Sequence, residues 1–261
     1  MRYSSSVLIT LLYCIIQDIQ AADYVGVYFY KEIGCYKKDG TPPQYECPNF
    51  SLNGTCRFRN SVLKIGDKVD KELIKGSCHA DCQCTTNGRM NCTDFGCPDR
   101  LKSGCSHFKY SLDTCCDVDS VCGPIAECTL DGETYQEGNY MYPKNSCEVC
   151  ICDVNFKKES PFCRPRKCFD QTNHQVEFFG YGAPVFFKDE KCCPSTWITD
   201  EGDAIRKMNK KAEPNSGSFC KFGDKIIQLG YGFERKVKRD WRDIPVHCEC
   251  SLPPFLICTE I

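Results

Sequence analysis

Cysteine is the residue that most constrains this chain, because 25 of its 261 residues are cysteine. At this density, paired cysteines rather than a large apolar core are expected to hold the fold together. Cysteines pair stably only in an oxidising compartment. The composition therefore predicts a disulfide scaffold that reaches its final form outside the reducing cytosol.

The first residues have the character of an export signal. Arg2 supplies a positive charge, Val7 to Ile16 form an apolar run, and residues 19–22 (IQAA) offer a cleavage site. The apolar run is too short to span a bilayer, and no later segment is long enough to be a transmembrane helix. A buried N-terminal helix is the alternative. We expect a signal peptide over 1–21 and a secreted, extracellular protein, in which the loss of Cys14 leaves 24 cysteines, an even number.

The net charge is close to zero, at −2. It gives no reason to expect nucleic acid or a membrane surface as a partner. Asn49, Asn53 and Asn91 each begin an Asn-x-Ser/Thr sequon, so in an exported chain they are expected glycan acceptors. Asn91 is the weakest of the three, because its neighbour Cys92 is expected in a bridge.

A repeat is visible in the spacing of the cysteines. Three of them are followed ten residues later by a glycine, as Cys56 and Gly66, Cys128 and Gly138, and Cys220 and Gly230. Turn residues and a β-prone stretch lie between each cysteine and its glycine, which predicts three β-hairpins. A tight cysteine cluster then follows in each unit: Cys78, Cys82 and Cys84; Cys147, Cys150 and Cys152; Cys248 and Cys250.

Further cysteines complete the first two units and leave the third truncated. One more follows in every unit (Cys92, Cys163, Cys258), and the first two units then add Cys97 and Cys168, followed by the vicinal pairs Cys115-Cys116 and Cys192-Cys193. This order resembles the von Willebrand factor type C (VWC) module of chordin-like and kielin-like extracellular proteins. The first unit fills all ten positions of the family pattern, although its cluster reads CxxxCxC rather than CxxCxC. The second unit fills eight positions and the third fills four.

The resemblance implies a pairing for these cysteines. In the first unit the pairs are Cys56–Cys84, Cys78–Cys115, Cys82–Cys92, Cys97–Cys116 and Cys105–Cys122; in the second, Cys128–Cys152, Cys147–Cys192, Cys150–Cys163 and Cys168–Cys193; in the third, Cys220–Cys250 and Cys248–Cys258. With this pairing the shorter units lack whole bridges and leave no single thiol. Cys35 and Cys47 remain and are expected to pair with each other.

The expected fold is small, disulfide-rich and mainly β, with tandem VWC-like modules of short antiparallel sheets and little helix. Units of this size bury too little apolar surface to fold comfortably without bridges. We divide the chain into an arm with one local disulfide (22–55), module one (56–123), module two (124–194), a polar linker without strand signal (195–218) and a truncated module three (219–261).

Two aromatic segments leave alternatives open. Tyr24–Tyr30 is β-prone and is either a strand that covers module one or an arm that binds a partner. Phe178–Phe187 is either an exposed contact loop, because exposed apolar patches usually mark interaction sites, or a core that packs where a bridge is missing.

Reactive chemistry is not evident in the sequence. Cys147 and Cys150 form a CxxC pair without the βαβ context of a redox site. Cys78, His79, Cys82 and Cys84 could hold zinc, but disulfides are favoured in an exported chain. We find no catalytic constellation and expect no enzymatic activity, no cofactor and no metal.

One cluster of cations is a candidate for binding sulfated glycans, and a solvated strand face is its alternative. It consists of Arg235, Lys236, Lys238, Arg239 and Arg242.

The leading functional hypothesis is a secreted binding protein. The resemblance implies a secreted protein ligand of the BMP/TGF-β growth-factor class, bound by residues 23–92. The alternatives are a structural or adhesive matrix component, a glandular defensive or venom-type protein, and a protease inhibitor, for which no reactive loop stands out.

Overall fold

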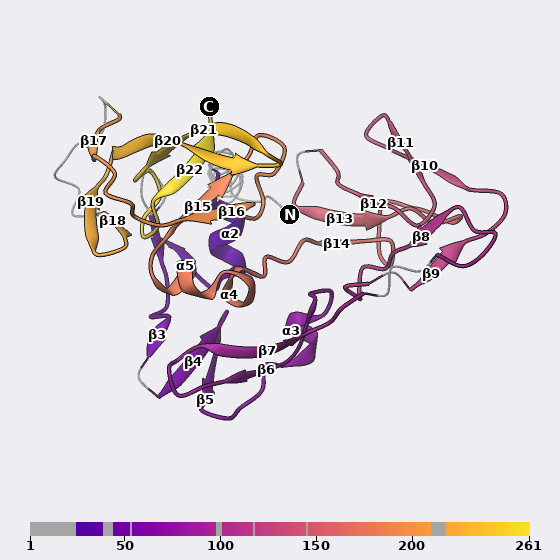
Figure 1. Cartoon of the computed structure of the whole chain (residues 1–261), viewed down its shortest axis with the longest axis horizontal. Helices are drawn as coiled ribbons and strands as arrows, with labels where there is room; N and C mark the ends of the chain where they lie inside the picture. Colours follow the sequence, from indigo (N-terminus) through magenta and orange to yellow (C-terminus); the bar gives the residue numbers. More distant parts are fainter. Residues whose placement is uncertain are drawn as a thin grey trace, which may run out of the picture. The chain divides into compact units, whose positions relative to one another are not determined.

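The computed structural model describes residues 25–38, 44–52, 54–97, 101–116, 118–144, 146–209 and 218–261 (Figure 1). The chain forms two compact units: residues 49–173 form one, and residues 174–261 form the other together with the segment before residue 49. The fold is mainly β, with 41% strand and 9% helix. Short antiparallel sheets and many disulfides confirm the predicted fold class. Within the described ranges, no helix is both long and apolar enough to cross a membrane.

The first half of the 49–173 unit packs two small sheets and one short helix around a bridge-rich core. Its elements are β3 (Ser51–Leu52), β4 (Thr55–Phe58), β5 (Ser61–Lys64), α3 (Lys71–Ile74), β6 (His79–Cys84) and β7 (Met90–Asp94). β6 and β7 pair with an irregularity between Ala80 and Gln83. Phe58, Ile74 and Met90 pack with Cys56 and Cys82 in the core.

The second half of this unit repeats the hairpin arrangement. Its elements are β8 (His107–Lys109), β9 (Asp119–Val121), β10 (Glu127–Leu130), β11 (Glu133–Gln136), β12 (Tyr140–Met141), β13 (Glu148–Ile151), β14 (Cys163–Pro165) and α4 (Asp170–Asn173). Asp131 and Gly132 form the two-residue turn between β10 and β11, and both have positive φ. A turn of this kind matches the twist of the strands that it joins, which is why glycine is favoured in it.

The other unit is built on a six-stranded sheet in the order β16-β15-β22-β21-β20-β17. Its strands are β15 (Ala183–Phe186), β16 (Thr196–Ile198), β17 (Arg206–Lys207), β20 (Tyr231–Arg239), β21 (Arg242–Glu249) and β22 (Ile257–Glu260). β15 and β22 run parallel, whereas the other neighbours are antiparallel. Two small sheets and two helices complete the unit: β1 (Tyr36–Lys38), β2 (Gln44–Glu46), β18 (Phe219–Phe222), β19 (Lys225–Gln228), α2 (Val27–Glu32) and α5 (Gln175–Phe179).

The predicted hairpins form at all three positions. Each cysteine lies in the first strand of its hairpin: Cys56 in β4, which pairs with β5, Cys128 in β10, which pairs with β11, and Cys220 in β18, which pairs with β19. The turn chemistry and the β-prone residues beside it were therefore sufficient to locate them.

The N-terminal arm differs from both alternatives drawn from the sequence. It forms the helix α2 rather than a strand, and it packs in the unit of residues 174–261 rather than on module one. Phe29 and Tyr30 are fully buried. The Phe29 ring lies 5.8 Å from Trp197 and 6.0 Å from Phe255, centroid to centroid. Burial of these rings outweighs the β propensity of the aromatic sequence, because strand propensity depends strongly on context.

The aromatic segment 178–187 is part of a core rather than an exposed loop, and this core is that of the unit of residues 174–261. Phe178, Phe186 and Phe187 are buried in the core around the six-stranded sheet. The boundary expected at residue 194 is therefore wrong, since residues 174–194 belong to the same compact unit as module three.

The expected polar linker 195–218 is wrong over its first part. Residues 196–198 form β16, with Trp197 and Ile198 buried, and residues 206–207 form β17. Two apolar residues within a polar sequence were enough to place this segment in the sheet. Residues 210–217 lie outside the described ranges.

The following bridges join cysteines as the resemblance implies, except Cys35–Cys47, which was expected because these two remained. The structure contains Cys35–Cys47, Cys56–Cys84, Cys78–Cys115, Cys82–Cys92, Cys97–Cys116, Cys105–Cys122, Cys128–Cys152, Cys150–Cys163, Cys220–Cys250 and Cys248–Cys258. Cys147, Cys168, Cys192 and Cys193 are also disulfide-bonded. Their expected pairing, Cys147–Cys192 and Cys168–Cys193, stays a prediction.

Candidate functional site

An open cavity of about 440 Å³ lies in module one. It is lined by residues of α3, the start of β6 and the loop 113–116. Residues from distant parts of the sequence line it, among them Lys71, Ile74, His79, Phe95, Asp113 and Cys115. This cavity is the candidate ligand site of the protein.

The helix α3 forms the first wall of the cavity. The Asp70 carboxylate caps the helix by accepting a hydrogen bond from the Glu72 N–H at 2.9 Å, which satisfies one of the free amides of the first turn. The chain then reverses at Gly76, which has φ +85°. A Cβ at this position would lie 2.8 Å from the Leu112 carbonyl oxygen, so only glycine fits without displacement. Ser77 follows and donates its hydroxyl to the Ile74 carbonyl at 2.7 Å.

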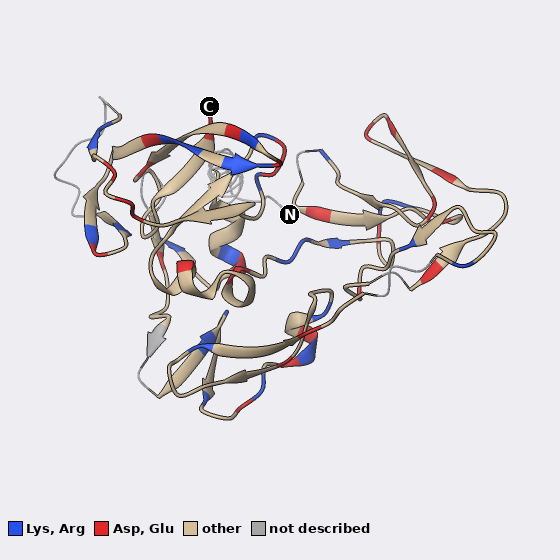
Figure 2. Ribbon diagram, viewed as in Figure 1, with Lys and Arg blue, Asp and Glu red and all other residues tan. Residues whose placement is uncertain are grey.

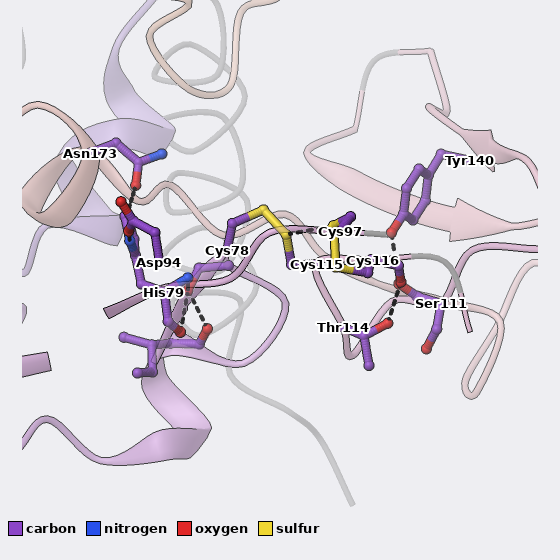
Figure 3. The surroundings of a disulfide bond; sticks show 12 residues. Cys78, His79, Asp94, Cys97, Ser111, Thr114, Cys115, Cys116, Tyr140 and Asn173 are labelled. Carbon is purple, nitrogen blue, oxygen red and sulfur yellow. Dashed lines mark hydrogen bonds and ion pairs between the residues drawn. A yellow bond between two sulfur atoms is a disulfide. The ribbon is translucent and has the colours of Figure 1, made fainter. Parts of the chain in front are cut away.

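Two adjacent disulfides hold the opposite wall. Cys78–Cys115 ties the loop to the residue before β6, and Cys97–Cys116 ties it to the segment after β7 (Figure 3). Thr114 Oγ1 donates to the Cys116 carbonyl at 2.8 Å. Covalent anchoring at two consecutive residues therefore positions a loop that has no regular secondary structure.

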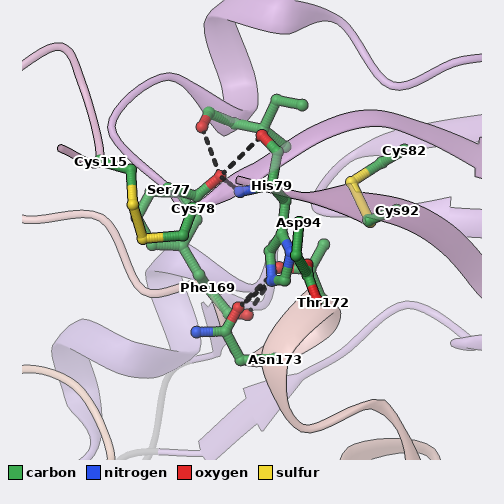
Figure 4. A network of polar contacts seen from close by, with 11 residues as sticks. Ser77, Cys78, His79, Cys82, Cys92, Asp94, Cys115, Phe169, Thr172 and Asn173 are labelled. Carbon is green, nitrogen blue, oxygen red and sulfur yellow. Dashed lines mark hydrogen bonds and ion pairs between the residues drawn. A yellow bond between two sulfur atoms is a disulfide. The ribbon is translucent and has the colours of Figure 1, made fainter. Parts of the chain in front are cut away.

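His79 is held in the cavity wall by two oxygen atoms. Its Nδ1 lies 2.5 Å from Asp94 Oδ1, and its Nε2 lies 2.5 Å from Asn173 Oδ1 (Figure 4). His79 therefore acts as a link between β6, β7 and α4.

The polar side chains of the cavity are engaged in structural contacts. The Ser77 hydroxyl bonds to main-chain atoms of Ile74 and His79, and both nitrogens of His79 have the partners just described. Within the described residues, Ser77 and His79 do not form a nucleophile–base pair.

Charges of both signs surround an apolar floor. Lys75 lies 3.3 Å from Asp113 Oδ2 and 3.8 Å from Glu72 Oε2. A hydrogen bond from Lys68, aided by the charges of Lys68 and Lys71, holds the pKa of the Asp81 carboxyl below its usual value.

The apolar part of the cavity is accessible. Ile74 is buried beneath it, and the Phe95 side chain at its edge is 55% exposed. An aromatic ring with charged neighbours is the kind of surface that receives an apolar side chain of a partner.

The cysteines of the zinc site that the sequence disfavoured are engaged in other bonds. Cys78, Cys82 and Cys84 are bridged to Cys115, Cys92 and Cys56. A second sulfur cluster is present, because the Sγ atoms of Cys97, Cys115 and Cys116 lie within 4.8 Å of one another. All three belong to disulfides, and a disulfide sulfur is not the thiolate that binds metal.

The expected glycan acceptors are partly described. Asn49 and Asn91 are exposed, and Asn91 lies on β7 beside Cys92. Asn53 lies outside the described residues. The two exposed positions remain predicted acceptors.

The cation cluster does not form one free positive patch. Asp and Glu lie at both ends of the run of Lys and Arg in the β20–β21 hairpin (Figure 2). Three of its cations have carboxylate partners: Arg235 with Asp203 at 3.1 Å, Lys238 with Asp243 at 2.7 Å, and Arg239 with Asp189 at 2.8 Å. Lys236 and Arg242 are exposed and have no ion pair among the described residues. The pairing weakens the sulfated-glycan hypothesis, which stays a prediction.

The cavity was not predicted from the sequence. Its walls come from residues 71–81, 95 and 113–116, which only the bridges bring together. The one local signal was the short sequence Lys71–Lys75 (KELIK), in which an apolar pair lies between charged residues of both signs.

Comparison with family models, curated proteins and solved structures finds no match for this chain. The resemblance to VWC modules therefore rests on the order of the cysteines.

Proposed function

We propose that this chain is a secreted extracellular binding protein whose module-one cavity receives a side chain of a secreted protein ligand. The observation that carries the proposal is the cavity itself, where an accessible aromatic ring lies beside charges of both signs. Such a site can bury an apolar group and pair with polar groups around it, as a protein interface does.

The disulfide content supports secretion. All 24 cysteines after residue 14 are disulfide-bonded, and such bridges persist only in an oxidising environment. The resemblance to VWC modules supports a growth factor of the BMP/TGF-β class as the ligand. This step is an analogy between folds, because one fold hosts many functions. We also propose that the protein acts by binding and not by catalysis.

The contact surface differs from the one expected from the sequence. A contribution of the aromatic arm was one of the two alternatives left open by the sequence, but Phe29 and Tyr30 are fully buried in the unit of residues 174–261. Deletion of residues 23–33 is therefore expected to impair folding and secretion. A loss of binding in that deletion would not identify a contact surface, so the test must use exposed residues.

Phe95→Ala tests the proposal, with Phe219→Ala as its matched control. Both phenylalanines are about half exposed, and only Phe95 lines the cavity. Binding of the secreted protein to immobilised dimers of the BMP/TGF-β class would be measured by surface plasmon resonance. Phe95→Ala should weaken binding at least tenfold, about 1.4 kcal/mol, whereas Phe219→Ala should leave it unchanged.

Two results would contradict the proposal. Equal affinity of both variants and the wild type would exclude the cavity as the contact surface. Failure of the wild type to bind any dimer would exclude the growth-factor class, and retention in extracellular matrix would then favour the structural alternative.

A further inference from the structure

The two disulfides in the cavity wall lie in contact with each other. Because Cys115 and Cys116 are consecutive, their bridges to Cys78 and Cys97 meet at the same loop. The Sγ atoms of Cys97 and Cys115 belong to different bridges and lie only 3.7 Å apart (Figure 3). A thiolate formed on either atom would already be next to the sulfur of the other bridge.

The four cysteines differ in their access to solvent. Cys78 and Cys97 are exposed, whereas Cys115 and Cys116 are partly buried. Thiol–disulfide exchange begins with attack of a thiolate on a disulfide sulfur that it can reach. An external thiol can therefore reach Cys78, and the sulfur that leaves is that of Cys115.

We propose that Cys78 is a site of S-thiolation by a small external thiol, coupled through Cys115 and Cys97 to the release of Cys116. The external thiolate attacks Cys78 Sγ, forms a mixed disulfide and releases the Cys115 thiolate. This thiolate attacks Cys97 Sγ, 3.7 Å away, forms Cys97–Cys115 and releases the Cys116 thiolate.

The reaction balances without an oxidant or a reductant. One thiol and two disulfides, Cys78–Cys115 and Cys97–Cys116, become one thiol and two disulfides. The new disulfides are Cys97–Cys115 and the mixed disulfide on Cys78, and the proton of the external thiol ends on Cys116. The second step matters because it removes the Cys115 thiolate, which would otherwise expel the external thiol again.

The other bridges of module one do not offer this arrangement. Cys56, Cys82 and Cys84 are buried, so a thiol cannot reach them. Cys105–Cys122 is accessible, since Cys122 is exposed. Among the described residues, however, the close sulfur cluster contains Cys97, Cys115 and Cys116 and neither Cys105 nor Cys122. Cys105–Cys122 is therefore a matched control for accessibility alone.

The exchange would also alter the cavity. Cys115 and Cys116 line it, and exchange would detach the loop from the residue that precedes β6. The modified protein should therefore bind its ligand less tightly, an expectation that rests on the proposed function. The chemical test below needs no ligand, so its outcome is independent of that function.

The test uses the intact secreted protein and reduced glutathione as the external thiol. After incubation the sample is quenched with acid, free thiols are labelled with N-ethylmaleimide, and non-reduced peptides are mapped by mass spectrometry. The expected products are glutathione on Cys78, a Cys97–Cys115 bridge and the label on Cys116. The summed modification of Cys105 and Cys122 by glutathione should be at least tenfold lower than that of Cys78.

Two mapping results would overturn the proposal. Glutathione on Cys97 with Cys78–Cys115 intact would show direct attack on the other bridge. Glutathione on Cys78 with the label on Cys115 would show that the second step does not occur.

A double variant tests the coupling directly. In Cys97→Ser/Cys116→Ser the acceptor bridge is absent, so stable thiolation of Cys78 should fall at least tenfold. Cys105→Ser/Cys122→Ser removes a bridge of the same module and should leave thiolation of Cys78 unchanged. Equal thiolation of Cys78 in the two variants would contradict the coupling. If either variant is not secreted, the peptide map of the wild type decides whether the second step occurs.

Discussion

The Tyr30 hydroxyl donates a hydrogen bond to the Leu252 carbonyl oxygen at 2.5 Å, although the two residues are 222 positions apart. The same oxygen of Tyr30 accepts a hydrogen bond from the Phe255 N–H at 3.0 Å. Burial raises the pKa of this hydroxyl well above its ordinary value, so it remains protonated and can donate. The N-terminal segment is therefore part of the C-terminal unit.

Tyr30→Phe should destabilise this unit by about 1–3 kcal/mol. The substitution keeps the ring but removes the hydrogen bonds to Leu252 and Phe255 at a fully buried position. Urea unfolding under non-reducing conditions would measure the change in the free energy of unfolding. Tyr36→Phe is the control, because Tyr36 is 56% exposed and water can replace its hydroxyl. Equal effects of the two variants would contradict a specific role of the buried hydroxyl.

The sequence predicted the local features of this fold better than its long-range contacts. The hairpins at Cys56, Cys128 and Cys220 were visible because turn residues and strand propensity act within a few positions. The helix α2 was missed because its aromatic rings are buried by contacts with Trp197 and Phe255. Local propensity contains no information about such distant partners.

The turn between β20 and β21 has an unusual residue at its second position, because a tryptophan stands there with positive φ. Asp240 and Trp241 have φ of +46° and +66°, and Trp241 is 100% exposed. Asp131 and Gly132 form a two-residue turn with the same signs of φ in the β10–β11 hairpin. Trp241 thus occupies a conformation that favours glycine, without any compensating burial.

Trp241→Gly should stabilise the unit by about 1 kcal/mol, since a left-handed conformation disfavours residues with a Cβ by about that amount. Gly132→Ala should have the opposite effect of similar size in the other unit. Urea unfolding measures both changes. A destabilised Trp241→Gly variant would show that the indole makes a stabilising contact in the folded protein.

The Arg239–Asp189 pair predicts a pH dependence of stability. The guanidinium donates to both carboxylate oxygens, at 2.8 and 2.9 Å. These hydrogen bonds hold the pKa of the Asp189 carboxyl below its ordinary value. The pair therefore adds stability above about pH 4, the ordinary carboxyl pKa, and this stability is lost as the pH falls through the lowered pKa.

Asp189→Asn should destabilise the protein at pH 7 by less than about 1 kcal/mol, because the carboxylate is largely exposed and screened by solvent. The difference from the wild type should shrink as the pH is lowered from about 5 to about 2. Urea unfolding across this range measures it. Asp224→Asn is the control, since Asp224 is exposed and has no ion pair among the described residues. A difference that is independent of pH would show that the charge of Asp189 is not responsible.

The cavity could not be predicted because its walls meet only after the chain is bridged. Nothing near Phe95 in the sequence indicates that Ile74 and Cys115 lie beside the same space. The pairing implied by the resemblance brings Cys78 and Cys115 together, but it does not specify the turn between Ile74 and Cys78. That turn depends on a single glycine.

Gly76→Ala tests whether this turn holds the cavity open. Gly76 has φ +85°, and an added Cβ would lie 2.8 Å from the Leu112 carbonyl oxygen, a main-chain atom that cannot move aside freely. Gly104 has a similar φ of +80° but open space around it. Gly104→Ala should therefore destabilise the 49–173 unit by the conformational cost alone, about 1 kcal/mol. Gly76→Ala adds the steric clash and should cost clearly more, with less protein secreted.

The comparison of Gly76→Ala with Gly104→Ala also distinguishes a loss of stability from a change in the shape of the cavity. In the fraction of Gly76→Ala that is secreted, the clash with the Leu112 carbonyl is relieved by a shift of the turn after α3 or of the chain before the loop 113–116, and either shift changes the cavity wall. Ligand binding should then fall at least tenfold for Gly76→Ala and stay unchanged for Gly104→Ala. Equal stability and equal binding of the two variants would show that the backbone at Gly76 adapts without disturbing Ile74, and the turn would then not be what positions the cavity.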